Sequence, residues 1–274
     1  MISIIIPLYN KQDTVARTLD SILSQSFAEF EIVVVDDGST DNSAAVVQGY
    51  DDARIKYIKK RNGGISSARN HGVDSSRYPW IMFLDADDWL LDDALLTFVH
   101  LIERYPDSLC FVCNYICKTV KGSSLYSRIY KEGLVKNGYK DWLLGKFMPR
   151  AGATLYHRSV MGKFRYEETL RRYEDAQHIV RVLNAYHYVR SPFPVMMYDI
   201  TNAQASKPID MGKDYLGHLD VVSKRGWAMV WEYEMYRKAL RDYPEGCKIR
   251  YGNYRSLGLW LICKMCGLYR KLFM

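Results

Sequence analysis

Short apolar runs alternate with amphipathic segments along the first 110 residues of the chain. Residues 2–6, 31–35 and 80–84 have the pattern of strands buried on both faces, and residues 55–58 predict a further short strand. Each strand is followed by apolar residues at helical spacing. Strand and helix therefore alternate four times, which predicts a parallel sheet with helices on both faces.

Capping residues and glycines predict where the helices begin. Ser39 or Thr40 is a suitable N-cap for the helix after the second strand. Gly63 and Gly64 precede a helix predicted over about 65–73.

Beyond residue 110 the alternation loosens, and we place a domain boundary near residue 205. This divides the chain into a domain of residues 1–205, with halves 1–105 and 106–205, and a helical, basic and aromatic extension of residues 206–274. The elements predicted are antiparallel strands within 109–130, a helix near 139–146, a strand at 153–157, a helix opened by Glu174 and Asp175, an extended segment at 188–200 and helices from about 212.

Charge is distributed unevenly over the 274 residues. Residues 1–109 carry ten Lys/Arg and seventeen Asp/Glu, whereas the remainder carries twenty-eight and fourteen. An acidic first half argues against a general nucleic-acid-binding protein, whose basic residues should face the polymer. The distribution suits a site in which carboxylates of the first part hold a metal while the basic remainder meets anionic partners. The alternative is that the two parts have solvated faces whose charge differs by chance.

The opening apolar run is short and lacks the basic start of a signal peptide, so a cytoplasmic location is expected. The six cysteines are then expected to be reduced thiols. Cys110 and Cys113, together with Cys263 and Cys266, have the spacing of a zinc site. Burial as small hydrophobic residues is the favoured interpretation.

Polar clusters follow three of the predicted strands, at residues 7–10, 36–39 and 85–88. Ligands of open α/β sheets bind beyond the carboxyl ends of the strands, which is where these clusters lie. Asp85 and Asp87 can hold a hard divalent cation together with phosphate oxygens. An acidic turn that favours the start of the next helix is the alternative.

Other residues of this edge suit a nucleotide. The Asp37 carboxylate can accept the imide or amide N–H of a base, and Tyr9 offers a ring for stacking. Asn62, Gly63 and Gly64 allow close backbone approach to a ligand, and Arg69 can reach a diphosphate. The alternative for Asp37 is a helix-capping turn, for Tyr9 simple packing, and for Arg69 a solvated position on the surface.

Several ordered motifs resemble those of the family 2 glycosyltransferases. The match is dense over residues 1–105, weaker to about 200 and absent from the tail. The resemblance implies the α/β GT-A fold, with a Rossmann-like mixed central sheet flanked by helices. The matching segments are 3–10 (SIIIPLYN), 24–27 (SQSF), 35–41 (VDDGSTD), 62–64 (NGG), 68–72 (ARNHG) and 83–88 (FLDADD).

The resemblance also implies roles for the matching positions. Asp85 would face the ribose and sugar, and Asp87 would bind Mg²⁺ or Mn²⁺, so that the two form the DXD pair. The ion would offset charge on the leaving diphosphate. Donor-binding residues implied in this way are Pro7, Tyr9, Asp37, Asn62, Gly63, Arg69, Asp85 and Ala86.

Inverting members of the family need a base on the acceptor side, commonly the Asp of a Glu-Asp pair. Asp175 occupies that place, and Glu174 is the second choice. A carboxylate there would accept the proton of the attacking hydroxyl. Family members usually have a Trp soon after this pair, whereas Gln177 and His178 stand at that place here, so the acceptor pocket departs from the family pattern.

The sequence thus predicts metal-dependent, inverting transfer of a single sugar from a nucleotide-diphosphate sugar, with a UDP-sugar favoured. The acceptor expected is a saccharide or a lipid-linked saccharide of the cell surface. One alternative is a sugar-phosphate nucleotidyltransferase, but the chain lacks the Gly-rich N-terminal loop of that class. The other is a non-catalytic nucleotide-sugar-binding module, which would need no base.

The tail of residues 257–274 is apolar and aromatic with interspersed cations. It is shorter than the ~20 uninterrupted apolar residues of a membrane span. An interfacial helix at the inner face of the membrane, a packed terminal helix and a homodimer contact are the three interpretations.

Overall fold

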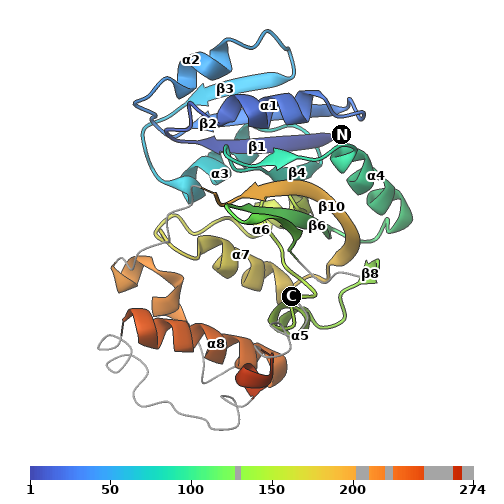
Figure 1. The fold of residues 1–274 in the computed structure, drawn as a ribbon, viewed down its shortest axis with the longest axis vertical. Helices are drawn as coiled ribbons and strands as arrows, with labels where there is room; N and C mark the ends of the chain where they lie inside the picture. The colour runs from blue at the N-terminus through green and yellow to red at the C-terminus, as the bar shows by residue number, and fades with distance from the viewer. Residues whose placement is uncertain (127–130, 202–209, 220–224, 244–261, 267–274) are drawn as a thin grey trace.

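The computed structural model contains one mixed β-sheet (Figure 1). The order of its strands is β3-β2-β1-β4-β9-β6-β10-β5, with β7 paired to β6 and β8 paired to β10. The sheet confirms the expected mixed α/β architecture. The described residues are 1–126, 131–201, 210–219, 225–243 and 262–266. Four parallel strands form one half of the sheet: β1 (Ile2–Leu8), β2 (Phe30–Asp36), β3 (Ile55–Lys59) and β4 (Trp80–Phe83).

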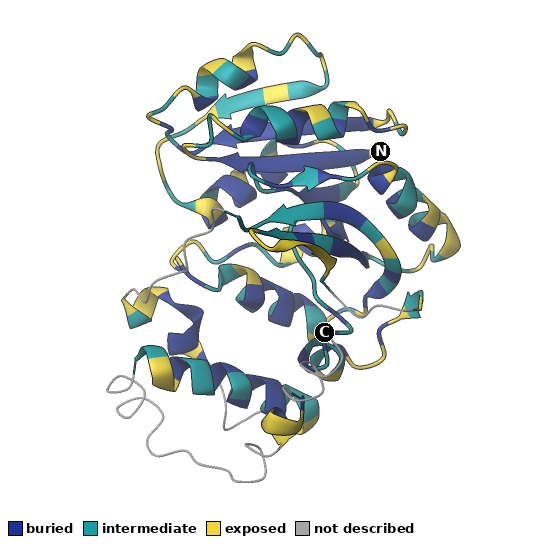
Figure 2. Ribbon diagram, viewed as in Figure 1, coloured by how far each residue is buried: buried dark blue, intermediate teal, exposed yellow. Residues whose placement is uncertain are grey.

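Helices cover both faces of this parallel half, as the alternating pattern predicts. α1 (Val15–Leu23) and α4 (Ala94–Arg104) share one core cluster with Ile6 of β1. α3 (Ile65–Ser75) belongs to the other cluster, together with Ile5 of the same strand. Successive residues of β1 therefore point into different cores. β1 and β2 are buried along their whole length (Figure 2).

The helix after β2 begins later than the sequence predicts. α2 spans Ser43–Gln48 and is preceded by Asn42, so neither Ser39 nor Thr40 is its N-cap. Both candidates are engaged by Asn10 instead. Ser39 Oγ accepts a hydrogen bond from the Asn10 backbone N–H (3.1 Å), and the Thr40 N–H donates to Asn10 Oδ1 (2.9 Å). These bonds hold the segment as a loop beside the end of β1.

The second half of the sheet contains both parallel and antiparallel pairings. β9 lies antiparallel between β4 and β6, and β6 and β7 pair antiparallel as predicted for 109–130, as far as that range is described. The strands are β5 (Trp89–Leu90), β6 (Cys110–Thr119), β7 (Gly122–Leu125), β8 (Gly133–Leu134), β9 (Thr154–His157) and β10 (Val189–Asp199), and the helices are α5 (Gly138–Leu143), α6 (Arg158–Lys163) and α7 (Glu174–Leu183).

A third core cluster joins the C-terminal segment to this half of the sheet. Leu143 of α5 and Val180 of α7 share it with Trp231 of α8. The predicted boundary near residue 205 and most of the predicted tail lie outside the described residues. The described C-terminal elements are the 3₁₀ helices η1 (Met211–Lys213) and η2 (Tyr215–His218), the helix α8 (Gly226–Asp242) and a helical segment at 262–266.

The described cysteines are buried thiols, which confirms the favoured interpretation of these residues. Cys110 and Cys113 lie on β6 in different core clusters, whereas Cys263 and Cys266 belong to the third cluster. The two pairs are therefore not gathered in one site. Among the described residues, no helix combines the length and hydropathy that crossing a bilayer requires.

Candidate active site

The predicted polar clusters lie at the carboxyl ends of adjacent parallel strands. Leu8 pairs with Asp36 at the ends of β1 and β2, and Ile5 of β1 pairs with Phe83 at the end of β4. The backbone N–H of Asp37 donates to the Leu8 carbonyl (2.8 Å). The structure therefore brings the three clusters to one edge of the sheet.

Asp37 is buried and accepts three hydrogen bonds. Its Oδ1 accepts from Lys60 Nζ (2.6 Å) and the Gly63 N–H (2.9 Å), and its Oδ2 accepts from the Gly64 N–H (2.7 Å). Gly64 has φ +87°, a conformation that L side chains rarely adopt. A carboxylate has about four acceptor sites, so bonds from the described residues occupy three of them and leave one on Oδ2.

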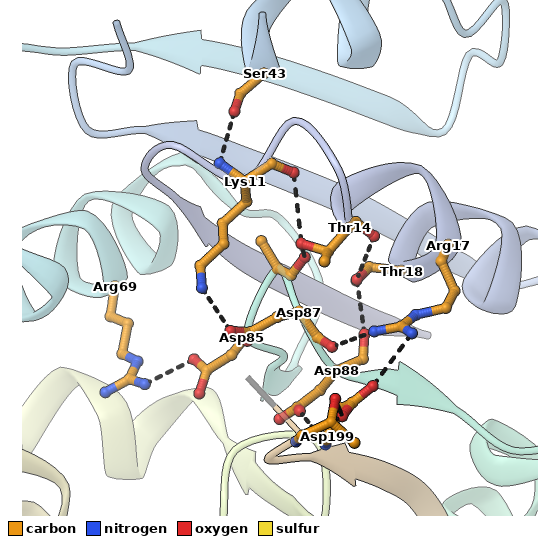
Figure 3. A network of polar contacts seen from close by, with 12 residues as sticks. Lys11, Thr14, Arg17, Thr18, Ser43, Arg69, Asp85, Asp87, Asp88 and Asp199 are labelled. Carbon is orange, nitrogen blue, oxygen red and sulfur yellow. Dashed lines mark hydrogen bonds and ion pairs between the residues drawn. The ribbon is translucent and has the colours of Figure 1, made fainter. Parts of the chain in front are cut away.

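The turn of residues 85–88 is held by side chains of α1 and of Thr14, which directly precedes that helix (Figure 3). Thr14 Oγ1 donates to the Ala86 carbonyl (2.8 Å), and Thr18 Oγ1 donates to the Asp88 carbonyl (2.7 Å). Arg17 Nη2 donates to the Asp87 carbonyl (2.7 Å). With its carbonyls fixed in this way, the turn holds the acidic side chains in defined directions.

The side chains of Asp85 and Asp87 each meet a cationic group. Arg69 Nη2 lies 2.9 Å from Asp85 Oδ1, and Lys11 Nζ lies 2.6 Å from Asp87 Oδ2 (Figure 3). The Asp87 side chain is 38% exposed and that of Asp85 25%. Each carboxylate thus has one oxygen in an ion pair and remains partly accessible to solvent.

The donor set at this turn fits a divalent cation that takes most of its ligands from a bound diphosphate. The described residues contain no cluster of three or more His, Cys, Asp or Glu side chains that could enclose a metal. Mg²⁺ is commonly bound by one or two carboxylates plus substrate phosphates, and Asp85 and Asp87 supply that number.

Asp88 does not face the same way as its two neighbours. It is 1% exposed, and its Oδ1 accepts the backbone N–H of Asp199 (3.1 Å). Burial, and next the charge of Asp85, raise the pKa of Asp88 to about 8. This buried environment favours the protonated form of the carboxyl group.

Arg69 lies between the acidic turn and α7. Besides its contact with Asp85, its Nη1 lies 3.4 Å from Glu174 Oε1, and its guanidinium lies 5.0 Å from the Tyr166 ring centroid. Its side chain is 4% exposed. Burial lowers the pKa of Arg69, but the nearby carboxylates, chiefly Asp85, raise it well above its ordinary value. It is therefore a permanent cation.

The two acids at the start of α7 differ in environment. Glu174 is largely buried, and burial followed by the charge of Asp175 raises its pKa, while Arg69 opposes the shift. Asp175 is exposed, and its Oδ1 accepts the Ala176 N–H (2.7 Å). Asp85 and Asp175 line the same small cavity of about 30 Å³.

The sequence matches the family model described as glycosyl transferase family 2 over residues 3–165, more than half of the chain. The chain belongs to this family. The assignment confirms the resemblance carried by the motifs of the first hundred residues.

Two curated relatives differ in how much of their length the chain covers. Glycosyltransferase GlyA of Streptococcus pneumoniae is 31% identical over 179 residues, which are 61% of this chain and 26% of GlyA. The GalNAc(5)-diNAcBac-PP-undecaprenol beta-1,3-glucosyltransferase of Campylobacter jejuni is 28% identical over 99% of this chain and 83% of its own length. The chain thus spans about a quarter of GlyA but most of the second relative.

Solved structures of other glycosyltransferases have the same fold. Staphylococcus aureus TarS 1-349 in complex with UDP-GlcNAc has a TM-score of 0.68 at 19% identity, over 96% of this chain and 79% of that one. Mannosyltransferase PcManGT from Pyrobaculum calidifontis, in complex with GDP-Man and Mn²⁺, has a TM-score of 0.58 at 14% identity, over 99% of this chain and 86% of that one. The family 2 chain therefore has the GT-A fold.

The remaining predicted donor residues of this family 2 chain lie along the same edge. Tyr9 is 47% exposed, so its ring is accessible, whereas Pro7 is buried within β1. Asn62 is exposed beside the glycines that bind Asp37, and Ala86 is buried in the acidic turn.

Sequence reasoning missed two cations of this site. Lys11 pairs with Asp87, and Arg150 lines the cavity beside Asp85 with its guanidinium 3.3 Å from the Tyr198 ring centroid. The position of Lys11 next to the first polar cluster was a usable signal. Arg150 lies between predicted elements, and nothing in its sequence neighbourhood marks it.

Proposed function

We propose that this chain is an inverting glycosyltransferase that moves one sugar from a nucleotide-diphosphate sugar to an acceptor hydroxyl, with a UDP-sugar as the favoured donor. The observation that carries the proposal is the shared cavity lined by Asp85 and Asp175, with Arg69 between the acidic turn and α7. A donor-side acid and an acceptor-side acid thus face one space.

The donor nucleoside binds at the ends of β1 and β2 in this proposal. The base stacks on Tyr9 and donates its imide N–H to the remaining acceptor site of Asp37. Pro7 forms the wall behind it, and Asn62 and Gly63 border the nucleoside. The three bonds that Asp37 accepts from the neighbouring loop support this role, because they hold the carboxylate in one orientation.

The diphosphate and sugar lie beside the acidic turn. Asp85 faces the ribose and sugar, next to Ala86, and Asp87 holds Mg²⁺ or Mn²⁺. When bound, the ion neutralises charge that develops on the departing diphosphate. Lys11 and Arg69 add fixed positive charge at the same place, and the contacts of these cations with Asp87 and Asp85 support that assignment.

Asp175 acts as the general base. Its carboxylate accepts the proton of the acceptor hydroxyl while the hydroxyl oxygen attacks the anomeric carbon from the face opposite the diphosphate, so the configuration inverts. The exposure of Asp175 supports the choice, because a base must reach the substrate. Glu174 is largely buried against Arg69, and a role in holding that arginine suits it better.

The acceptor is a saccharide or a lipid-linked saccharide, used in making a cell-surface polysaccharide or glycolipid. The Campylobacter relative, which is named for an acceptor linked to PP-undecaprenol, supports a lipid-linked acceptor. We assign catalysis to residues 1–205, with 1–105 binding the donor and 106–205 the acceptor. The described residues of the extension, which we assign to 206–274, contact the catalytic part through the third core cluster.

The test is release of UDP from UDP-glucose, UDP-galactose and UDP-GlcNAc with Mn²⁺ present, with and without an acceptor panel. We expect turnover of at least one donor, a loss of about 10²-fold or more in Asp87→Ala, and the same loss with EDTA. Asp92→Ala is the matched control, because this exposed acid lies just beyond the turn.

Full turnover of Asp87→Ala in the presence of EDTA, equal to that of the unaltered chain with Mn²⁺, would rule out the metal role. The anomeric configuration of the product, determined by NMR, tests inversion separately. A product that keeps the configuration of the donor would contradict the direct displacement.

A further inference from the structure

A second cavity adjoins Asp175 on the side away from the acidic turn. Its volume is about 300 Å³, at the lower end of the ~300–1,000 Å³ of ligand pockets. Arg150, Asp175 and Ile179 line both this cavity and the smaller one beside Asp85. The two cavities therefore meet at the candidate base.

Aromatic side chains from separate elements form much of the wall. Tyr115 of β6 stacks on Tyr126 with ring centroids 4.9 Å apart, and Trp142 of α5 lies 5.0 Å from Trp231 of α8. Such rings give the wall apolar surface whose geometry is held in place by packing. The C–H face of a pyranose ring matches a surface of this kind.

α8 also contributes polar groups to the cavity, and it lies beyond the region that matches the family model. Glu234 and Lys238 are one helical turn apart, and both line the cavity and are half-buried. Glu234 Oε2 accepts from Arg237 Nη1 (2.8 Å), and Lys238 Nζ lies 5.7 Å from the Tyr173 ring centroid. The helix thus places one acceptor and one donor of hydrogen bonds at the pocket.

Ion pairs at the start of α7 fix α8 in this position. Arg172 contacts Asp214 beside η2 (2.9 Å) and Asp242 at the end of α8 (2.7 Å). All three side chains are at most 8% exposed. Arg172 directly precedes Tyr173 and the two acids, so the wall formed by α8 is held in register with Asp175.

We propose that this cavity binds the acceptor's terminal sugar and that Glu234 and Lys238 of α8 determine which sugar is accepted. The inference rests on the proposed function and adds to it the class of acceptor group and the residues that select it. A neutral saccharide fits better than a free phosphate, because the carboxylates of Asp175 and Glu234 line the pocket as well as the cations Arg150 and Lys238.

The test measures binding of methyl glycosides to the full chain by saturation-transfer NMR, without donor or metal. The panel contains the methyl glycosides of glucose, galactose, mannose, GlcNAc and GalNAc. We expect at least one to bind, and Lys238→Ala and Glu234→Ala each to weaken that binding about ten-fold. Arg241→Ala is the matched control, because its side chain is 71% exposed on the same helix and is not among the cavity-lining residues.

Thermal melting of each variant checks that the fold is kept. Binding that the two cavity variants leave unchanged would overturn the inference, as would no glycoside binding at tens of millimolar. Inorganic phosphate binding in place of the glycosides would also overturn it. If the glycosides bind as expected but no UDP-sugar is turned over, the pocket stands and the proposed transfer fails.

Discussion

Arg69 is the residue that links the two acidic parts of the candidate site. Its buried guanidinium contacts Asp85 on one side and Glu174 on the other. Within the described part of the chain, its Nε has no hydrogen-bond partner. A buried cation that keeps an unsatisfied donor is costly, which suits a position where a phosphate or sugar oxygen arrives.

The two acids of α7 should respond differently to substitution. Asp175→Asn should lower the turnover number about 10²–10⁴-fold with little change in UDP affinity, because only proton transfer is lost. Glu174→Gln should cost less in turnover, because the amide can still accept a bond from Arg69. Steady-state kinetics with UDP titrations measures both. A larger loss in Glu174→Gln would move the base to Glu174.

His178 should make stability depend on pH. It is fully buried with Nε2 3.0 Å from the Phe164 carbonyl, and burial lowers its pKa to about 3. The unfolded chain takes up a proton below about pH 6.5 while the folded chain does not, so acidification favours unfolding. From pH 7 to 5, this residue alone should remove about 2 kcal/mol.

Urea unfolding of the unaltered chain and His178→Gln at both pH values isolates this effect, because the other titrating groups are common to both. The variant should lose about 2 kcal/mol less over the interval. Equal losses in the two proteins would mean that His178 is protonated in the folded state.

Close contact between α3 and β1 sets the position of Arg69. A Cβ on Gly72 of α3 would overlap the side chain of Ile5, so the helix can approach the sheet only with glycine there. Arg69 lies about one helical turn from this glycine, so the close contact of α3 with β1 also sets where Arg69 lies in the site.

Gly72→Ala should therefore destabilise the fold by about 1–3 kcal/mol through overpacking. Gly162→Ala in α6 is the control, because a Cβ there meets nothing within 4 Å and alanine favours the helix by up to ~1 kcal/mol. Urea unfolding measures both. A stable Gly72→Ala variant would show that α3 can shift without loss.

At the scale of the whole molecule, the rule that ligands bind beyond the carboxyl ends of parallel strands predicted that Asp37, Asp85 and Asp87 lie at one edge of the sheet. They do, because adjacent parallel strands end at that edge. The same rule cannot find the pairing of Lys11 with Asp87, which are 76 residues apart, since no periodicity links them. It also missed that Asp88 turns toward Asp199, because side-chain direction within a turn depends on its carbonyl contacts.

The attachment of the C-terminal segment depends on Arg172. Arg172→Leu would leave Asp214 and Asp242 as buried carboxylates without this cation, and loss of such a partner costs about 3–5 kcal/mol. We expect earlier unfolding in urea and faster proteolytic cleavage in the extension. The stability of Arg172→Lys should lie between those of the unaltered chain and Arg172→Leu, because one ammonium group replaces the forked guanidinium. Unchanged unfolding in Arg172→Leu would argue against the attachment.

The most direct test of the donor site is a calorimetric titration of UDP into the unaltered chain and into Asp87→Ala, each with and without Mn²⁺. We predict that Mn²⁺ strengthens UDP binding by the unaltered chain at least ~ten-fold, and that Asp87→Ala loses this gain while keeping the weaker metal-free binding. Failure of the unaltered chain to bind UDP with Mn²⁺, or an equal gain in Asp87→Ala, would contradict the account.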